Sequence, residues 1–146
     1  MVAIRVEIHP ELRADIELAL AAHPFALAQI IKDFTVCMES KGQSLPSYMG
    51  CDQPYHEPAA ARSGQLRHIH IALPPQTFRA SDRQAYRKCD IKRPQLDAAL
   101  VYVQGELYED RYMILAFFAP SAHDKAKVNA VMTRLGVLAK KFRDEN

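Results

Sequence analysis

Three histidines and one arginine have the chemistry that cleavage of a phosphodiester needs. His68 and His70 stand two positions apart in an alternating segment, so both side chains leave the same face of a predicted strand. His123 follows the last apolar segment, and Arg93 precedes the one before it. Metal-free cleavage of RNA requires a base near the 2′-hydroxyl, an acid near the leaving 5′-oxygen and cations around the phosphate. We therefore take these four residues as catalytic candidates and expect them to converge on one concave surface.

Each candidate also has a simpler interpretation. The strand histidines would be half-exposed residues without a chemical role, or a His-x-His pair of metal ligands. His123 would be a surface residue in the cap of a helix, and Arg93 one more solvated charge. Because the sequence shows no obvious third ligand and the surrounding charge is positive, we expect neither a metal site nor a cofactor. The sequence leaves open which histidine is the base and which is the acid.

Positive charge is concentrated in the middle of the chain. Residues 62–93 hold eight Lys and Arg against two Asp, whereas residues 1–61 hold four Lys and Arg against eight Asp and Glu. Such a segment favours a partner that carries phosphate groups, with a solvated loop as the alternative. In this region and beyond it, Arg67, Lys92 and Lys125 are candidates for electrostatic binding of RNA. Tyr102 suits either the core or the edge of a cleft, and if exposed its ring would stack on a base.

The hydrophobic pattern predicts an α+β fold. Alternation indicates strands, apolar residues at helical spacing indicate helices, and residues 42–65, rich in Gly, Pro, Ser and Gln, indicate a long irregular connection. The last helix is expected to begin at a capping Ser121. The predicted elements are strands at 2–8, 66–73, 98–104 and 111–119 and helices at 10–24, 27–41 and 121–143. Three consecutive late strands favour a small antiparallel sheet of order β-α-α-β-β-β-α with helices packed on one side.

Length and composition predict a single domain, residues 1–146. The chain is 49% hydrophobic, which is enough for one continuous core. No apolar run is long enough to span a bilayer and the N-terminus alternates, so we expect a soluble, cytoplasmic protein. The odd number of cysteines, Cys37, Cys51 and Cys89, without a CxxC pair, suits a reducing cytosol and supports neither a disulfide framework nor a zinc site.

Four groups of residues, in order along the chain, resemble one known family. They are Leu45-Pro46 with Gly50, Asp52 and Tyr55; His68-Ile69-His70-Ile71-Ala72 with Pro74-Pro75; Arg93 ahead of Leu100-Val101-Tyr102 and Gln104-Gly105; and Pro120 with His123, Ala126, Asn129, Met132, Gly136, Ala139, Phe142 and Arg143. Across residues 42–143 the chain resembles the YafO toxins of type II toxin–antitoxin systems, which are RelE-like mRNA interferases.

The resemblance implies a function and partners. It implies a ribosome-dependent endoribonuclease that cleaves mRNA and arrests translation, a RelE-type fold, and a cognate antitoxin protein. We expect the antitoxin to cover part of the basic surface with an acidic or helical segment. Two alternatives stay open: a non-catalytic toxin of the same fold that binds a protein target, and a plain RNA-binding domain. The clustered histidines favour catalysis.

We predict that the activity is independent of metal ions. Residues 62–93 are basic and poor in carboxylates, so they cannot readily form an oxygen cage for Mg²⁺. Cleavage should survive excess EDTA when the ribosomes are kept intact by other means. Complete loss of cleavage that one particular divalent ion restores would contradict this prediction.

Overall fold

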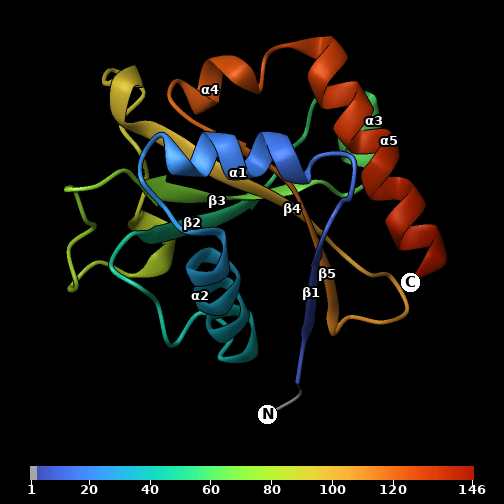
Figure 1. Cartoon of the computed structure of the whole chain (residues 1–146), viewed down its shortest axis with the longest axis horizontal. Helices are drawn as coiled ribbons and strands as arrows, with labels where there is room; N and C mark the ends of the chain where they lie inside the picture. Colours follow the sequence, from blue (N-terminus) through green and yellow to red (C-terminus); the bar gives the residue numbers. More distant parts are fainter. Residues whose placement is uncertain (1–2) are drawn as a thin grey trace.

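The computed structural model describes residues 3–146, so Val2 of the predicted first strand lies outside it. The described residues form a five-stranded sheet of order β1-β5-β4-β3-β2. Figure 1 shows the helices arranged around this sheet. The strands are β1 (Arg5–Ile8), β2 (Met49–Pro54), β3 (Arg67–Ala72), β4 (Asp97–Gln104) and β5 (Arg111–Phe118). The α-helices are α1 (Arg13–Ala21), α2 (Leu27–Glu39), α3 (Ala59–Ser63), α4 (Ala122–Lys125) and α5 (Asn129–Glu145), with 3-10 turns η1 (Gln84–Tyr86) and η2 (Pro94–Leu96).

The sheet is mixed, so the prediction of an antiparallel sheet is wrong at one edge. Strands β2 to β5 pair antiparallel with their neighbours, but β1 pairs parallel with β5, from Arg5 beside Arg111 to Ile8 beside Ile114. A hairpin forces two strands to run antiparallel. No such constraint acts on β1 and β5, because they lie at opposite ends of the sequence and meet only through tertiary packing.

The predicted irregular connection at residues 42–65 contains two regular elements, β2 and α3. Strand β2 lacks the alternating pattern because it includes Gly50 and Pro54 and its register shifts between Met49 and Asp52. A Cβ atom at position 50 would lie 2.3 Å from the backbone oxygen of Arg87, so this close approach of two chain segments requires glycine. The glycine that allows the backbone of Arg87 to lie this close therefore also interrupts the alternating pattern by which a strand is recognised in the sequence.

Helices cover both faces of the sheet, rather than one face as predicted. Along β4, Asp97 and Tyr102 point to opposite faces because their positions differ by an odd number. Phe34 of α2 packs edge-on against the Tyr102 ring at a centroid distance of 5.0 Å. On the other face, His123 of α4 contacts Asp97. In Figure 1, α2 accordingly lies below the strands, and α4 and the start of α5 lie above them.

The predicted C-terminal helix is divided into α4 and α5, and its predicted cap is wrong. Ser121 has a positive φ of 56° and its side chain makes no capping hydrogen bond. The carboxylate of Asp97 accepts the backbone N–H of His123 instead, at 2.7 Å. Helix α5 then buries Met132, Leu135, Ala139 and Phe142 and contacts the sheet and α3.

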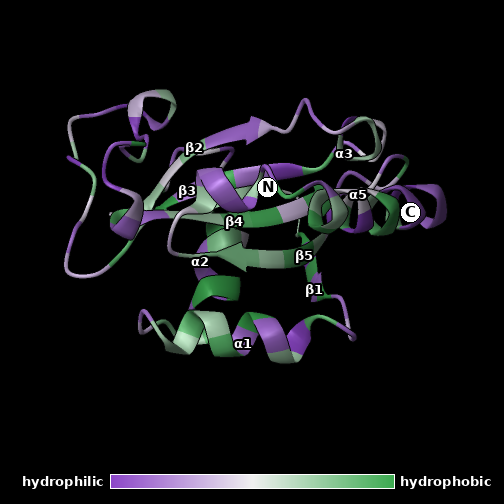
Figure 2. Cartoon of the chain, turned by 90° about the horizontal axis from the view of Figure 1, so that it is seen from above, coloured by the Kyte–Doolittle hydropathy of each residue, from purple (hydrophilic) through white to green (hydrophobic). Residues whose placement is uncertain are grey.

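The inner strands β4 and β5 are more hydrophobic than the β2 edge of the sheet. Figure 2 shows β4 and β5 mainly in hydrophobic colours. Strand β2 and much of the connection between β3 and β4 are drawn in hydrophilic colours. Helix α1 presents a mixed surface beside β5, with Ile16 and Leu20 buried. Within the described residues, no helix is both long enough and apolar enough to cross a membrane.

Candidate active site

The three candidate histidines lie together on one face of the sheet. The ring centroids of His68 and His70 are 5.4 Å apart, and those of His70 and His123 are 5.8 Å apart. Strand β3 supplies the first two rings, and α4 carries the third over the same face. With Tyr55 and Asp97, they line a pocket of about 30 Å³. A pocket of this size holds about one water molecule, so a nucleotide would contact its rim instead of entering it.

His123 is held by the buried carboxylate of Asp97. The Asp97 Oδ2 atom lies 2.7 Å from His123 Nδ1 and also accepts the His123 backbone N–H at 2.7 Å. Asp97 is 2% exposed, whereas the His123 side chain is 37% exposed. An ionised carboxylate can only accept hydrogen bonds, so Nδ1 must carry a proton. In the neutral ring, Nε2 therefore holds the free lone pair and is able to act as a base.

His70 has the opposite tautomer. Its Nδ1 atom accepts the backbone N–H of Cys89 at 2.9 Å, so in the neutral ring the proton is on Nε2. His70 is 4% exposed, and this burial lowers its pKa to about 4, with further lowering by the nearby charges of His123 and Lys88. At neutral pH, His70 is thus an uncharged hydrogen-bond donor through Nε2.

His68 lies at one end of the cluster, between Tyr55 and His70. Its ring stacks on Tyr55 with centroids 4.1 Å apart and an interplanar angle of 17°. Within residues 3–146, its buried Nδ1 atom has no hydrogen-bond partner. Burial, followed by the charges of His70 and His123, lowers the pKa of His68 to about 3. His68 is therefore uncharged at neutral pH and packs beside His70.

Arg93 is exposed and is not among the residues that line the histidine pocket. Its neighbour Pro94 accepts a hydrogen bond from the Ser121 backbone N–H at 2.8 Å, which fixes this part of the chain beside the start of α4. Lys92 is also exposed, and Lys125 donates to the backbone oxygen of Pro120 at 2.6 Å. The backbone thus places these cations near α4, but the structure shows no contact between them and the histidines.

Arg67 and Tyr102 lie on the opposite face of the sheet from the histidines, which corrects the expectation for Tyr102. Tyr102 is 1% exposed, and its hydroxyl donates to the Asp52 carboxylate at 2.6 Å to the nearer oxygen. Arg67 Nε lies 3.2 Å from the same carboxylate. These three residues join β2, β3 and β4. The Tyr102 ring has no exposed side on which a base could stack.

Sequence reasoning missed Asp97 and Cys89 and assigned no role to Tyr55. The available signal for Asp97 was a carboxylate directly before the apolar segment 98–104, which the sequence alone marks only as a boundary. Cys89 acts through its backbone N–H, and no side-chain pattern reveals such a contact. Tyr55 acts by stacking on a residue of the neighbouring strand.

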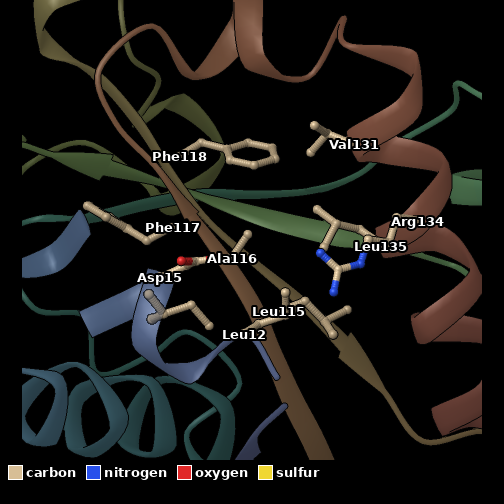
Figure 3. Close-up of a pocket in the computed structure, with 10 residues that line it drawn as sticks. Leu12, Asp15, Leu115, Ala116, Phe117, Phe118, Val131, Arg134 and Leu135 are labelled. Carbon is tan, nitrogen blue, oxygen red and sulfur yellow. The ribbon is translucent and has the colours of Figure 1, made fainter. Parts of the chain in front are cut away.

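A larger apolar groove lies elsewhere, along β5. Its volume is about 270 Å³, and it is bordered by the start of α1 and by α5. Figure 3 shows Leu12 and Asp15 on one side of β5 and Val131, Arg134 and Leu135 on the other. Among its lining residues only Asp15 and Arg134 are ionisable, and neither histidine nor cysteine lines this groove. Within residues 3–146, no group of three or more His, Cys, Asp and Glu side chains is arranged to hold a metal ion.

Comparison with known proteins identifies the family. Residues 38–144 match the family described as Toxin YafO, type II toxin–antitoxin system. The chain therefore belongs to the YafO toxin family. A relative from Escherichia coli (strain K12), named mRNA interferase toxin YafO, is 30% identical over 102 residues, which cover 68% of this chain and 73% of the relative. No solved structure matches the chain.

We predict that the protein loses stability as the pH falls from 6.5 toward 4. The folded-state pKa values of His70 and His68, about 4 and about 3, lie below the ordinary value of 6.5. In this range the unfolded chain binds protons that the folded chain excludes, so the free energy of unfolding decreases. Between pH 7 and pH 5, His70 should account for about 1–2 kcal/mol of this loss.

Urea unfolding at several pH values measures the effect. His70→Gln should show a shallower decrease than the unchanged protein, whereas His56→Gln, at an exposed histidine, should show the same decrease. Unfolding free energy that stays constant between pH 7 and pH 5 in the unchanged protein would contradict the burial of neutral histidines.

Proposed function

We propose that this toxin is an endoribonuclease that cleaves mRNA at the histidine cluster, with His123 as the general base. Membership of the YafO family and the name of the E. coli relative support the reaction class. The observation that carries the residue assignment is the contact of His123 with Asp97. It leaves Nε2 as the basic nitrogen of a partly exposed ring. None of the other grouped histidines combines a free basic nitrogen with a carboxylate partner.

The proposed reaction uses the 2′-hydroxyl of the RNA as its nucleophile. His123 Nε2 takes the hydroxyl proton while the 2′-oxygen forms a bond to the adjacent phosphorus. The bond from phosphorus to the 5′-oxygen breaks, and that oxygen takes a proton from solvent. The products are a 2′,3′-cyclic phosphate and a 5′-hydroxyl end. This route places no step on a metal ion.

Two further groups would stabilise the phosphate as its charge grows. His70 offers the Nε2–H of a neutral ring beside His123, and a preorganised donor of this kind is most effective where water is excluded. Arg93 would hold the phosphate from the exposed loop, where a guanidinium can form two parallel hydrogen bonds. His68 supports His70 by packing, and Lys92 and Lys125 would bind neighbouring phosphates.

The biological setting belongs to the same proposal. We place the reaction in the cytoplasm, on mRNA engaged by the ribosome, within a RelE-type fold. Type II systems pair such a toxin with an antitoxin protein. An acidic antitoxin segment over the exposed cations of residues 83–93 would hinder RNA binding, and complementary charge would speed its capture.

We predict that His123→Ala lowers mRNA cleavage by about a hundredfold or more, the usual effect of removing a general acid or base. The test incubates purified toxin with a defined transcript, with and without ribosomes, and maps new 5′ ends. His56→Ala, at an exposed histidine outside the cluster, should cleave like the unchanged protein. Equal cleavage rates for His123→Ala and the unchanged protein would refute the site, provided that circular dichroism shows both to be folded.

A further inference from the structure

The connection between β3 and β4 is anchored to β2 by a buried arginine. Arg87 is 6% exposed, and its guanidinium donates to the backbone oxygens of Met49 at 3.2 Å, Pro46 at 3.3 Å and Asp82 at 3.1 Å. Its own backbone oxygen accepts the Cys51 N–H at 2.8 Å. Although Arg87 belongs to the basic segment of the sequence, its guanidinium forms hydrogen bonds that hold the loop in place.

A second anchor joins the same loop to the histidine cluster. Two residues after Arg87, the Cys89 N–H donates to His70 Nδ1 at 2.9 Å, and the Cys89 thiol contacts the Ile71 backbone oxygen at 3.3 Å. Lys88 lies between the two anchors and is exposed, and its charge contributes to the lowered pKa of His70. The stretch from Arg87 to Cys89 therefore leads directly from the edge of β2 to the proposed active site.

An aromatic side chain projects from this anchored loop. Tyr86 ends the 3-10 turn η1 and is 73% exposed. The turn is fixed on its other side as well, because Gln84 Nε2 donates to the Gly50 backbone oxygen at 3.1 Å. Exposing a tyrosine ring forgoes the stabilisation that its burial would give, and such a ring on a fixed turn is a suitable platform for stacking. The exposed cations of the same segment are Arg83, Lys88, Lys92 and Arg93.

We propose that residues 83–93 form the surface that binds single-stranded RNA beside the cleavage site, with Tyr86 stacking on an unpaired base and Lys88 binding a phosphate. An exposed aromatic ring among cations is the combination by which proteins bind single strands with little sequence preference. The assignment of the neighbouring histidines to cleavage rests on the proposed function, but the binding surface does not. Tyr86 takes the stacking role that the sequence suggested for Tyr102.

Other exposed aromatic and cationic residues provide matched controls. Tyr108 is 49% exposed, but its ring is covered by the Arg111 guanidinium at 4.2 Å from the centroid. Lys140 pairs with Asp144 at 3.1 Å within α5. Neither residue belongs to residues 83–93, so a general effect of losing an aromatic ring or a positive charge from the surface can be measured separately.

The experiment measures the binding of a fluorescent 2′-O-methyl RNA oligonucleotide, which has no free 2′-hydroxyl and cannot be cleaved by the proposed route. Tyr86→Ala should weaken binding by about tenfold, within the range for loss of one stacked base, whereas Tyr86→Phe should bind like the unchanged protein. Lys88→Gln should weaken binding and reduce the slope of log K against log salt by about 0.7. Tyr108→Ala and Lys140→Gln should bind like the unchanged protein.

Several outcomes would overturn the proposal. The first is unchanged RNA binding by Tyr86→Ala, and the second is an equal loss of RNA binding by Tyr108→Ala. The third is a Tyr86→Ala variant that loses binding to purified antitoxin but still binds RNA. Failure of the proposed function is distinguishable from failure of this inference. If His123→Ala still cleaves mRNA while Tyr86→Ala loses RNA binding, the cleavage site is wrong and the binding surface stands. If His123→Ala abolishes cleavage while Tyr86→Ala binds RNA normally, the cleavage site stands and the proposed binding surface is wrong.

Discussion

The contact between Asp97 and His123 is the interaction on which the site depends. A carboxylate that is 2% exposed is costly to bury unless hydrogen bonds compensate for lost hydration, and His123 supplies two of them. One bond, from the backbone, fixes the start of α4 on the first residue of β4. The other, from the ring, fixes the side chain and its tautomer. The same carboxylate therefore positions both the helix and the group that we assign to proton transfer.

The neighbouring ring completes a division of roles between two histidines. His123 is hydrogen-bonded by a carboxylate and presents a lone pair, whereas His70 is hydrogen-bonded by a backbone N–H and presents a proton. Burial, followed by the charges nearby, lowers the pKa of both His70 and His68, so these two rings stay uncharged at neutral pH. The difference between the two rings thus follows from what each Nδ1 atom contacts.

The sequence predicted the parts of this arrangement that local periodicity controls. Alternation placed His68 and His70 on one face of a strand, and the apolar segments located β4, β5 and α2. Local periodicity could not predict contacts between distant parts of the chain. These are the parallel pairing of β1 with β5, the irregular β2 whose Gly50 lies against Arg87, and the capping of α4 by Asp97 instead of Ser121. Residue type alone could not distinguish the buried Tyr102 from the exposed Tyr86, because their burial is set by packing across the sheet.

The tautomer of the neutral His123 ring shows directly whether Asp97 holds the ring proton on Nδ1. Nitrogen-15 NMR of the imidazole in the full-length protein distinguishes a proton on Nδ1 from one on Nε2. We predict the Nδ1–H form in the unchanged protein and in Asp82→Asn, a control at a half-buried carboxylate that pairs with Arg79 and does not line the histidine pocket. Asp97→Asn should change the tautomer balance of the ring. A neutral His123 that carries its proton on Nε2 in the unchanged protein would show that Asp97 does not hold the proton on Nδ1 and that Nε2 is not the base.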